Sequence, residues 1–142
     1  MRSMVGRRLD RVLVQWHRFA GQDSATVKLW LVFSGNELGL QCDSSAAGLE
    51  LATEGPEPDF SMDQYGEIVT RDSSSEQPFA PLMNSELISV RNLRIPRQVK
   101  SLGVVLRFRP VGKLVIANWG DNLLVEGEVP AFILAESPDE VD

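Results

Sequence analysis

The feature that most constrains the fold of this chain is an internal repeat, in which one apolar pattern occurs twice within 142 residues. The matching segments are residues 9–12 (LDRV) and 29–33 (LWLVF) in the first half and residues 87–90 (LISV) and 104–108 (VVLRF) in the second. Leu9 and Val12 match Leu87 and Val90 at a constant offset of 78. A pattern that occurs twice in one chain predicts two equivalent supersecondary units.

Within each copy, apolar and other residues alternate with the period of two that is typical of a half-buried β-strand. Leu29 and Phe33 share one strand face, and Phe108 should point to the core while Arg107 and Arg109 point to the opposite face. We therefore expect a mainly β fold, with α+β as the alternative. It would comprise two antiparallel meanders packed as one sandwich or barrel-like domain, with at most one or two short helices, because neither meander alone can bury its apolar face.

The repeat also predicts how the chain is organised, as a single domain over residues 1–142. The expected parts are a first meander at about 9–52, an acidic connecting excursion at 53–81, a second meander at about 87–129 and a frayed acidic tail at 136–142. A last short strand is expected at 132–134. Within the excursion, proline and serine are frequent and only residues 65–69 are expected to form an ordered element.

Charge is strongly segregated along the chain, although the net charge is only -6. Residues 37–86 contain eleven acidic residues and one base, Arg71, whereas residues 87–120 contain seven bases and no acid. Acidic residues on an excursion can steer a basic protein partner, and an aromatic side chain among them can anchor it. The sequence thus predicts a non-catalytic protein-binding surface at Glu54, Glu57, Asp59, Asp63, Tyr65 and Glu67.

Two other binding functions stay open. The arginine-rich second half offers an alternative surface at Arg107, Arg109 and Trp119, which could act as a nucleic-acid-binding module. This alternative is less favoured, because Phe108 should point away from both arginines and the chain is acidic overall. A small-ligand-binding β-shell is the other alternative, and it requires an apolar cavity between the two meanders.

No catalytic motif is found, so we expect no enzymatic activity, no cofactor and no metal. His17 is the only histidine and Cys42 the only cysteine, and neither lies in a nucleophilic or metal-binding motif. A single cysteine and apolar runs of at most five residues favour a cytoplasmic protein without a signal peptide or membrane span. Exposed edge strands, or a surface around Trp16 and Trp30, could support a homodimer.

The segments 112–123 (GKLVIANWGDNL) and 62–67 (MDQYGE) resemble small bacterial β-domains, some of which are similar to immunity proteins encoded beside toxins. The resemblance implies a non-catalytic protein that binds and blocks a toxin. It implies no specific functional residue.

Overall fold

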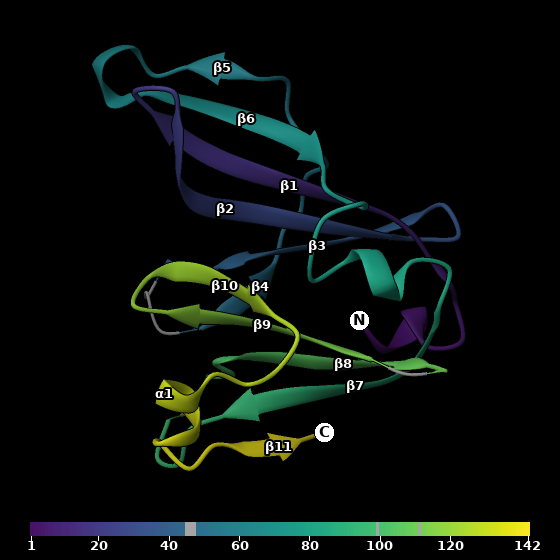
Figure 1. Ribbon diagram of the computed structural model, residues 1–142. Coiled ribbons are helices and arrows are strands. Elements are labelled where there is room, and N and C mark those ends of the chain that lie inside the picture. Colours follow the sequence, from purple (N-terminus) through teal and green to yellow (C-terminus); the bar gives the residue numbers. More distant parts are fainter. Residues whose placement is uncertain (45–47, 99, 111) are drawn as a thin grey trace.

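The computed structural model describes residues 1–44, 48–98, 100–110 and 112–142, which form two antiparallel β-sheets packed as a sandwich (Figure 1). The strands of the six-stranded sheet lie in the order β4-β3-β2-β1-β6-β5, and those of the five-stranded sheet in the order β10-β9-β8-β7-β11. The predicted mainly β fold is confirmed, as an open sandwich and not as a closed barrel. The strands are β1 (Leu9–Phe19), β2 (Gln22–Phe33), β3 (Asn36–Cys42), β4 (Leu49–Leu51), β5 (Phe60–Ser61), β6 (Glu67–Asp72), β7 (Glu86–Arg94), β8 (Gly103–Arg109), β9 (Lys113–Trp119), β10 (Asn122–Glu126) and β11 (Asp139–Val141), and the helices are η1 (Arg2–Met4), η2 (Asp63–Tyr65), η3 (Ala80–Leu82) and α1 (Ala131–Leu134).

The repeat extends to five strands in each half. Strands β1 to β4 form a meander in one sheet, and β7 to β10 form the equivalent meander in the other. In each sheet the next long connection ends in a strand that pairs antiparallel with the first strand, β6 with β1 and β11 with β7. This arrangement extends the Greek-key pattern, in which a late strand returns beside the first. The prediction of a frayed acidic tail was wrong, because the tail supplies strand β11.

A local pseudo-twofold axis relates the starts of the two halves, and backbone hydrogen bonds lie across it. The segment before β1 pairs antiparallel with the start of β7 through a bridge between Arg8 and Glu86, which are themselves 78 residues apart. Four hydrogen bonds surround this bridge in two symmetry-related pairs: Leu9 N to Ser85 O (3.0 Å) with Leu87 N to Arg7 O (2.9 Å), and Asn84 N to Leu9 O (2.7 Å) with Gly6 N to Leu87 O (2.8 Å). At the starts of the two halves, residues that are 78 positions apart in the sequence therefore make equivalent backbone hydrogen bonds.

The main core lies between the two inner sheet faces and is built from the residues that alternate inward. Leu29, Leu31 and Phe33 of β2 face Leu106 and Phe108 of β8, and all five are almost inaccessible to solvent. The rings of the equivalent residues Phe33 and Phe108 stack with centroids 6.4 Å apart and planes 11° apart. The prediction that Phe108 points into the core, away from its arginine neighbours, is confirmed.

Three hairpins turn tightly through two residues with positive φ, which matches the type I′ turns that suit twisted strands. The turn residues are Ala20 and Gly21 (φ 53° and 77°), Ser34 and Gly35 (48° and 86°), and Gly120 and Asp121 (62° and 63°). The first turn ends at Gly21, so β2 starts at Gln22, and β1 and β2 form a long hairpin.

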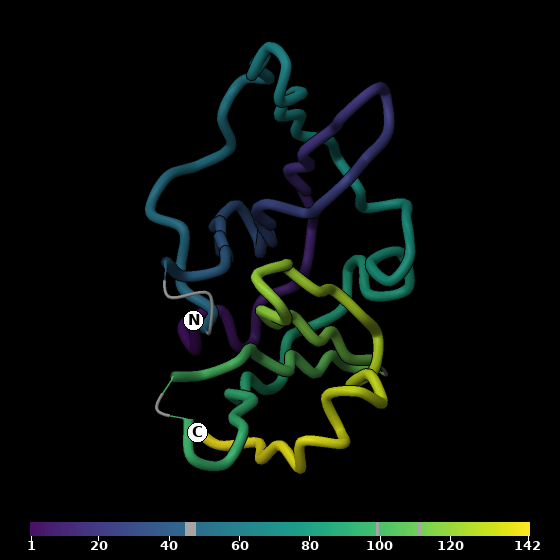
Figure 2. Tube along the Cα trace, turned by 90° about the vertical axis from the view of Figure 1, so that its left-hand side faces the viewer, coloured from purple at the N-terminus to yellow at the C-terminus, as the bar shows by residue number. Residues whose placement is uncertain are grey.

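Each half has a long connection that crosses the outer face of its own sheet. It runs from the last strand of the meander to the strand that pairs with the first strand of the same meander. Residues 52–66 connect β4 to β6, and residues 127–138, with α1, connect β10 to β11 (Figure 2). The excursion therefore contains more order than predicted, since β5, η2 and β6 lie within it and η3 begins at its end. The strand predicted at 132–134 was also wrong: α1 lies there, with Ile133 fully buried against the outer face of the five-stranded sheet.

Candidate functional site

The acidic connection 52–66, called here the acidic strap, is fixed to the outer face of the six-stranded sheet. The indole Nε1 of Trp30 donates a hydrogen bond to the Glu54 carbonyl (3.1 Å). Lys28, on the same face, pairs with the Glu57 carboxylate at 3.4 Å. Further along, the backbone N–H of Thr70 donates to Asp59 Oδ1 (2.9 Å). These contacts turn a proline-rich acidic segment into an ordered cover for the sheet.

Tyr65 lies where the strap turns back into β6, at the end of the sheet that carries the β1–β2 and β5–β6 turns, called here the distal end. Its side chain is 67% exposed, the largest value among the exposed large apolar side chains described. Its carbonyl oxygen accepts a hydrogen bond from His17 Nε2 at 2.6 Å. The next residue, Gly66, has φ +100° and packs so closely that a Cβ would lie 2.2 Å from the Arg18 carbonyl oxygen. The backbone beneath Tyr65 is thus held directly against β1.

His17 forms a second contact that the sequence did not indicate, with Ser24 across the β1–β2 hairpin. Its Nδ1 lies 2.5 Å from the Ser24 hydroxyl, which donates to the His17 carbonyl oxygen at 3.0 Å. Because Nε2 donates to Tyr65, Nδ1 of a neutral ring accepts, and the single Ser24 hydroxyl proton is shared between Nδ1 and the His17 carbonyl oxygen. The geometry supports a bracing role for His17, in which it connects the hairpin to the loop that presents Tyr65.

The six residues predicted to bind a partner all lie on the strap or at the start of β6, but their side chains differ in availability. Glu57 and Asp59 are bonded to the sheet, and Glu67 lies 3.9 Å from Arg18. Among the described residues, no side-chain partner is found for Glu54, Asp63 or Tyr65, and all three are exposed. Phe60 and Phe19, which are 44% and 54% exposed, add apolar surface toward the same distal end.

The alternative surface of Arg107, Arg109 and Trp119 does not form one site. Arg107 binds Glu140 of β11 through two hydrogen bonds of 2.6 and 2.9 Å, which raise the pKa of Arg107 and lower that of Glu140. Because Gly103 of β8 pairs with Ala117, Trp119 lies at the opposite end of the sheet from Arg107, about 20 Å along the strand direction. The arginines and the aromatic ring are too far apart to hold one stacked base.

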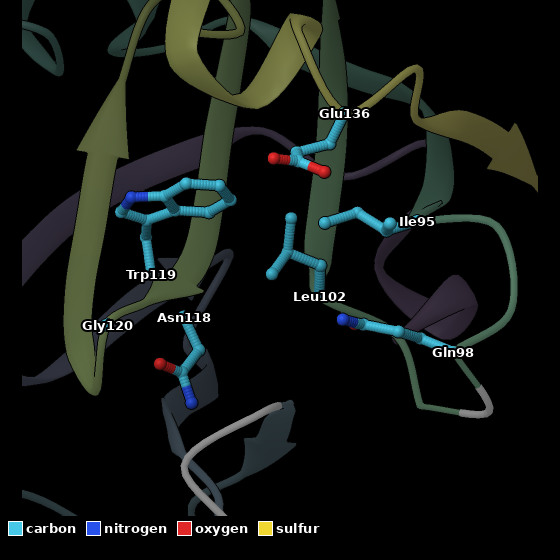
Figure 3. Close-up of a pocket in the computed structure, with 7 residues that line it drawn as sticks. All are labelled: Ile95, Gln98, Leu102, Asn118, Trp119, Gly120 and Glu136. Carbon is cyan, nitrogen blue, oxygen red and sulfur yellow. The ribbon is translucent and has the colours of Figure 1, made fainter.

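Trp119 instead borders a pocket of about 480 Å³ at the outer face of the five-stranded sheet (Figure 3). Its ring contacts Phe132 of α1 with centroids 5.2 Å apart. Ile95 and Leu102 form the facing apolar wall, and the side chains of Gln98 and Glu136 extend toward the space beside the indole. The pocket lies outside the sandwich, whereas the β-shell alternative required a cavity between the meanders. There the inner faces form the main core, and a smaller hollow of about 140 Å³ lies beside Val14, Trp16 and Val125.

The single thiol does not have the environment of a nucleophile. Burial, followed by the nearby carboxylates Asp121 and Asp43, raises the pKa of Cys42 to about 11. A thiol with a raised pKa is almost entirely protonated at neutral pH, and the thiolate is the reactive form. Within the described part of the chain, no group of three or more histidine, cysteine or acidic residues is arranged to hold a metal ion.

The fold and its surfaces define a pseudo-symmetric β-sandwich with an acidic face on one sheet and a small pocket on the other. Comparisons of the chain with models of protein families, with curated proteins and with solved structures find no match. The resemblance to immunity-type domains therefore stays a prediction. Of the helices in the described residues, none has the length and apolar character needed to span a membrane.

Proposed function

We propose that this protein binds a basic protein partner through the acidic strap and the distal end of the six-stranded sheet, with Tyr65 as the anchor. The observation that carries the proposal is the combination at Tyr65 of a 67% exposed side chain and a backbone held by His17 and Gly66. Large aromatic side chains on rigid supports dominate binding energies at protein interfaces, because little conformational entropy is lost when they bind.

Charge on the same face supports a basic partner. Glu54 and Asp63 are exposed, and among the described residues no cation neutralises either carboxylate. Exposed carboxylates around an aromatic anchor attract a positively charged surface and increase the rate of encounter. Glu57 and Asp59 serve the fold, because they bond Lys28 and the Thr70 backbone, so they are unsuitable for testing binding.

The proposal can be tested with an immobilised library of 15-residue peptides in which basic, neutral and acidic sequences are equally represented. We expect the wild-type protein to select basic peptides that contain an apolar residue. Binding of the selected peptides should fall about 30-fold or more in Tyr65→Ala, as for an interface hot spot. The double variant Glu54→Lys/Asp63→Lys should mainly slow association and weaken its dependence on salt.

A matched control is Phe132→Ala, which removes a 48% exposed aromatic side chain from α1, beside the other sheet, and should leave binding unchanged. The proposal is overturned if the library selects neutral or acidic peptides, or if Tyr65→Ala binds as tightly as wild type. It is also overturned if the wild-type chain is a dimer that Tyr65→Ala converts to a monomer, because the surface would then be an interface between two copies.

A further inference from the structure

We infer that the pocket beside Trp119 binds a small organic cation, in which an alkylammonium or guanidinium group is attached to an apolar body. The site is independent of the proposed protein-binding surface. It lies on the outer face of the five-stranded sheet, between the β9–β10 hairpin, the segment that follows β7, and the residues after α1. Its volume of about 480 Å³ falls within the range typical of small-molecule sites.

The pocket is formed by the fold without a ligand. The backbone N–H of Asn118 donates to the Leu102 carbonyl (2.9 Å), which joins the two sides of the pocket floor. The buried Asn118 side chain donates to the Gly48 carbonyl (3.0 Å) and accepts from the Asp121 N–H (3.1 Å). Phe132 supports the Trp119 ring from α1, where Ile133 is fully buried. Both the floor and the aromatic wall are therefore positioned in advance.

The polar groups that face the pocket are available for a ligand. Within the described part of the chain, no hydrogen-bond or ion-pair partner is found for the Glu136 carboxylate, the Gln98 side-chain amide or the Trp119 Nε1. Figure 3 shows the Glu136 carboxylate and the Gln98 amide reaching from different sides toward the space between Trp119 and Leu102. A small number of converging polar groups on apolar walls is the usual composition of a specific small-molecule site.

The negative charge that Glu136 brings to the pocket favours a cationic ligand. Glu136 is the one charged residue among the described residues that line the pocket. Arg94, Arg97 and Asp139 line an adjoining hollow that shares Ile95 and Gln98 with the pocket, and the Arg94 guanidinium donates to the Gln98 carbonyl at 3.1 Å. A carboxylate can bind an ammonium or guanidinium group by a charge-assisted hydrogen bond, and an indole ring attracts the same cation through its π face. Ile95 and Leu102 provide the contact for an apolar body. An anionic ligand would be repelled by Glu136.

The test uses three probes of similar size that differ in charge: 2-phenylethylammonium, neutral 2-phenylethanol and anionic 3-phenylpropionate. Binding is followed at pH 7 by the ¹⁵N–¹H signal of the Trp119 indole, which Trp119→Phe identifies among the three tryptophans. We expect the ammonium probe to shift this signal and to bind at least about tenfold more tightly than the alcohol. Glu136→Gln should remove this preference without affecting the fold, because Glu136 is exposed.

The matched control is Glu126→Gln, which neutralises an exposed carboxylate on β10 outside the pocket and should leave the preference intact. Tyr65→Ala should also leave it intact, so failure here can be separated from failure of the protein-binding proposal. The inference is overturned if no probe shifts the Trp119 signal, if alcohol and ammonium bind equally, or if Glu136→Gln binds the ammonium as tightly as wild type.

Discussion

At the scale of single residues, two buried polar atoms beneath the acidic strap have no hydrogen-bond partner among the described residues. These atoms are Nε2 of Gln15, a residue that is 2% exposed, and Oγ1 of Thr70. The two residues are paired across β1 and β6, so the unpaired atoms belong to one region of the outer face. A buried donor or acceptor without a partner costs about 1–3 kcal/mol of stability.

We therefore expect Gln15→Leu to stabilise the protein by about 1 kcal/mol, because it replaces an unpaired amide by an apolar side chain of similar size. Thr70→Val, which replaces the hydroxyl by a methyl group, should also stabilise the protein. Urea denaturation at pH 7 would measure the free energy of unfolding. The control is Gln41→Leu, since the Gln41 amide donates to Glu50 at 2.7 Å and its loss should give no gain. A decrease in stability in both Gln15→Leu and Thr70→Val would contradict this explanation.

The burial of Gln15 shows what single-residue patterns could and could not predict. Alternation along β1 correctly separates Val12 and Val14, which face the core, from Leu13 and Gln15 on the other face. It gives no information about whether that other face is covered. Coverage depends on the strap, whose position is set by distant contacts such as Trp30 with Glu54. The partner-binding candidates were therefore predicted as a group, but the bonded acids could not be distinguished from the free ones.

At the scale of elements, strand β11 depends on ion pairs more than on its own sequence. It has only three residues, Asp139–Val141, and its acidic composition favours disorder in isolation. In the fold, Glu140 binds Arg107 and Asp142 binds Arg91, and both arginines come from the half of the chain rich in bases. The charge segregation seen in the sequence is therefore partly neutralised within the molecule, between the basic second half and its acidic end.

Strand β11 should consequently detach more readily in acid. Hydrogen bonds from Arg107, and then its positive charge with those of Lys113 and Arg91, lower the pKa of Glu140. A carboxyl whose pKa is lowered by folding stabilises the fold above its ordinary pKa of about 4.3 and loses this contribution as the pH falls through the lowered value. Because both side chains are about one-third exposed, the effect is small, about 0.5 kcal/mol.

This prediction is checked by following the backbone NMR signals of residues 139–141 from pH 7 downward. We expect them to move toward unfolded positions below about pH 4, before the signals of the central strand β8 change. In Glu140→Gln, the same signals should be shifted already at pH 7 and should respond less to acid. Identical strand signals in Glu140→Gln and wild type at pH 7 would show that the ion pair does not hold β11.

At the scale of the whole molecule, the duplication was the most predictable property, because the buried core residues follow the same pattern in both halves. The inward residues Leu29, Leu31 and Phe33 of β2 match Val104, Leu106 and Phe108 of β8, so the repeat could be recognised from the sequence. The fifth strand of each half was not recognised as equivalent, because β6 and β11 share little sequence and owe their places to pairing with β1 and β7. The polar surfaces and crossing connections are where the two halves differ.

The pseudo-symmetry makes a final prediction about cooperativity between the two sheets. Phe33 and Phe108 occupy equivalent positions on different sheets and stack with each other at 6.4 Å, so each ring contributes to the contact between halves. Phe33→Leu and Phe108→Leu should each destabilise the protein. The double variant should lose less unfolding free energy than the two single variants lose together. The difference should be about 0.5–1.5 kcal/mol, which is the energy of an aromatic pair beyond its buried area.

Urea denaturation of the four proteins of this cycle, monitored by circular dichroism, measures that coupling. A control cycle combines Phe33→Leu with Val115→Ala, because Val115 is fully buried but belongs to the separate cluster on the outer face of the five-stranded sheet. The control pair should be additive, since its members do not share a cluster. If the losses of unfolding free energy in the Phe33 and Phe108 variants were also additive, the two rings would act as independent core residues. The halves would then be joined by the backbone pairing at Arg8 and Glu86 and by the remaining apolar contacts.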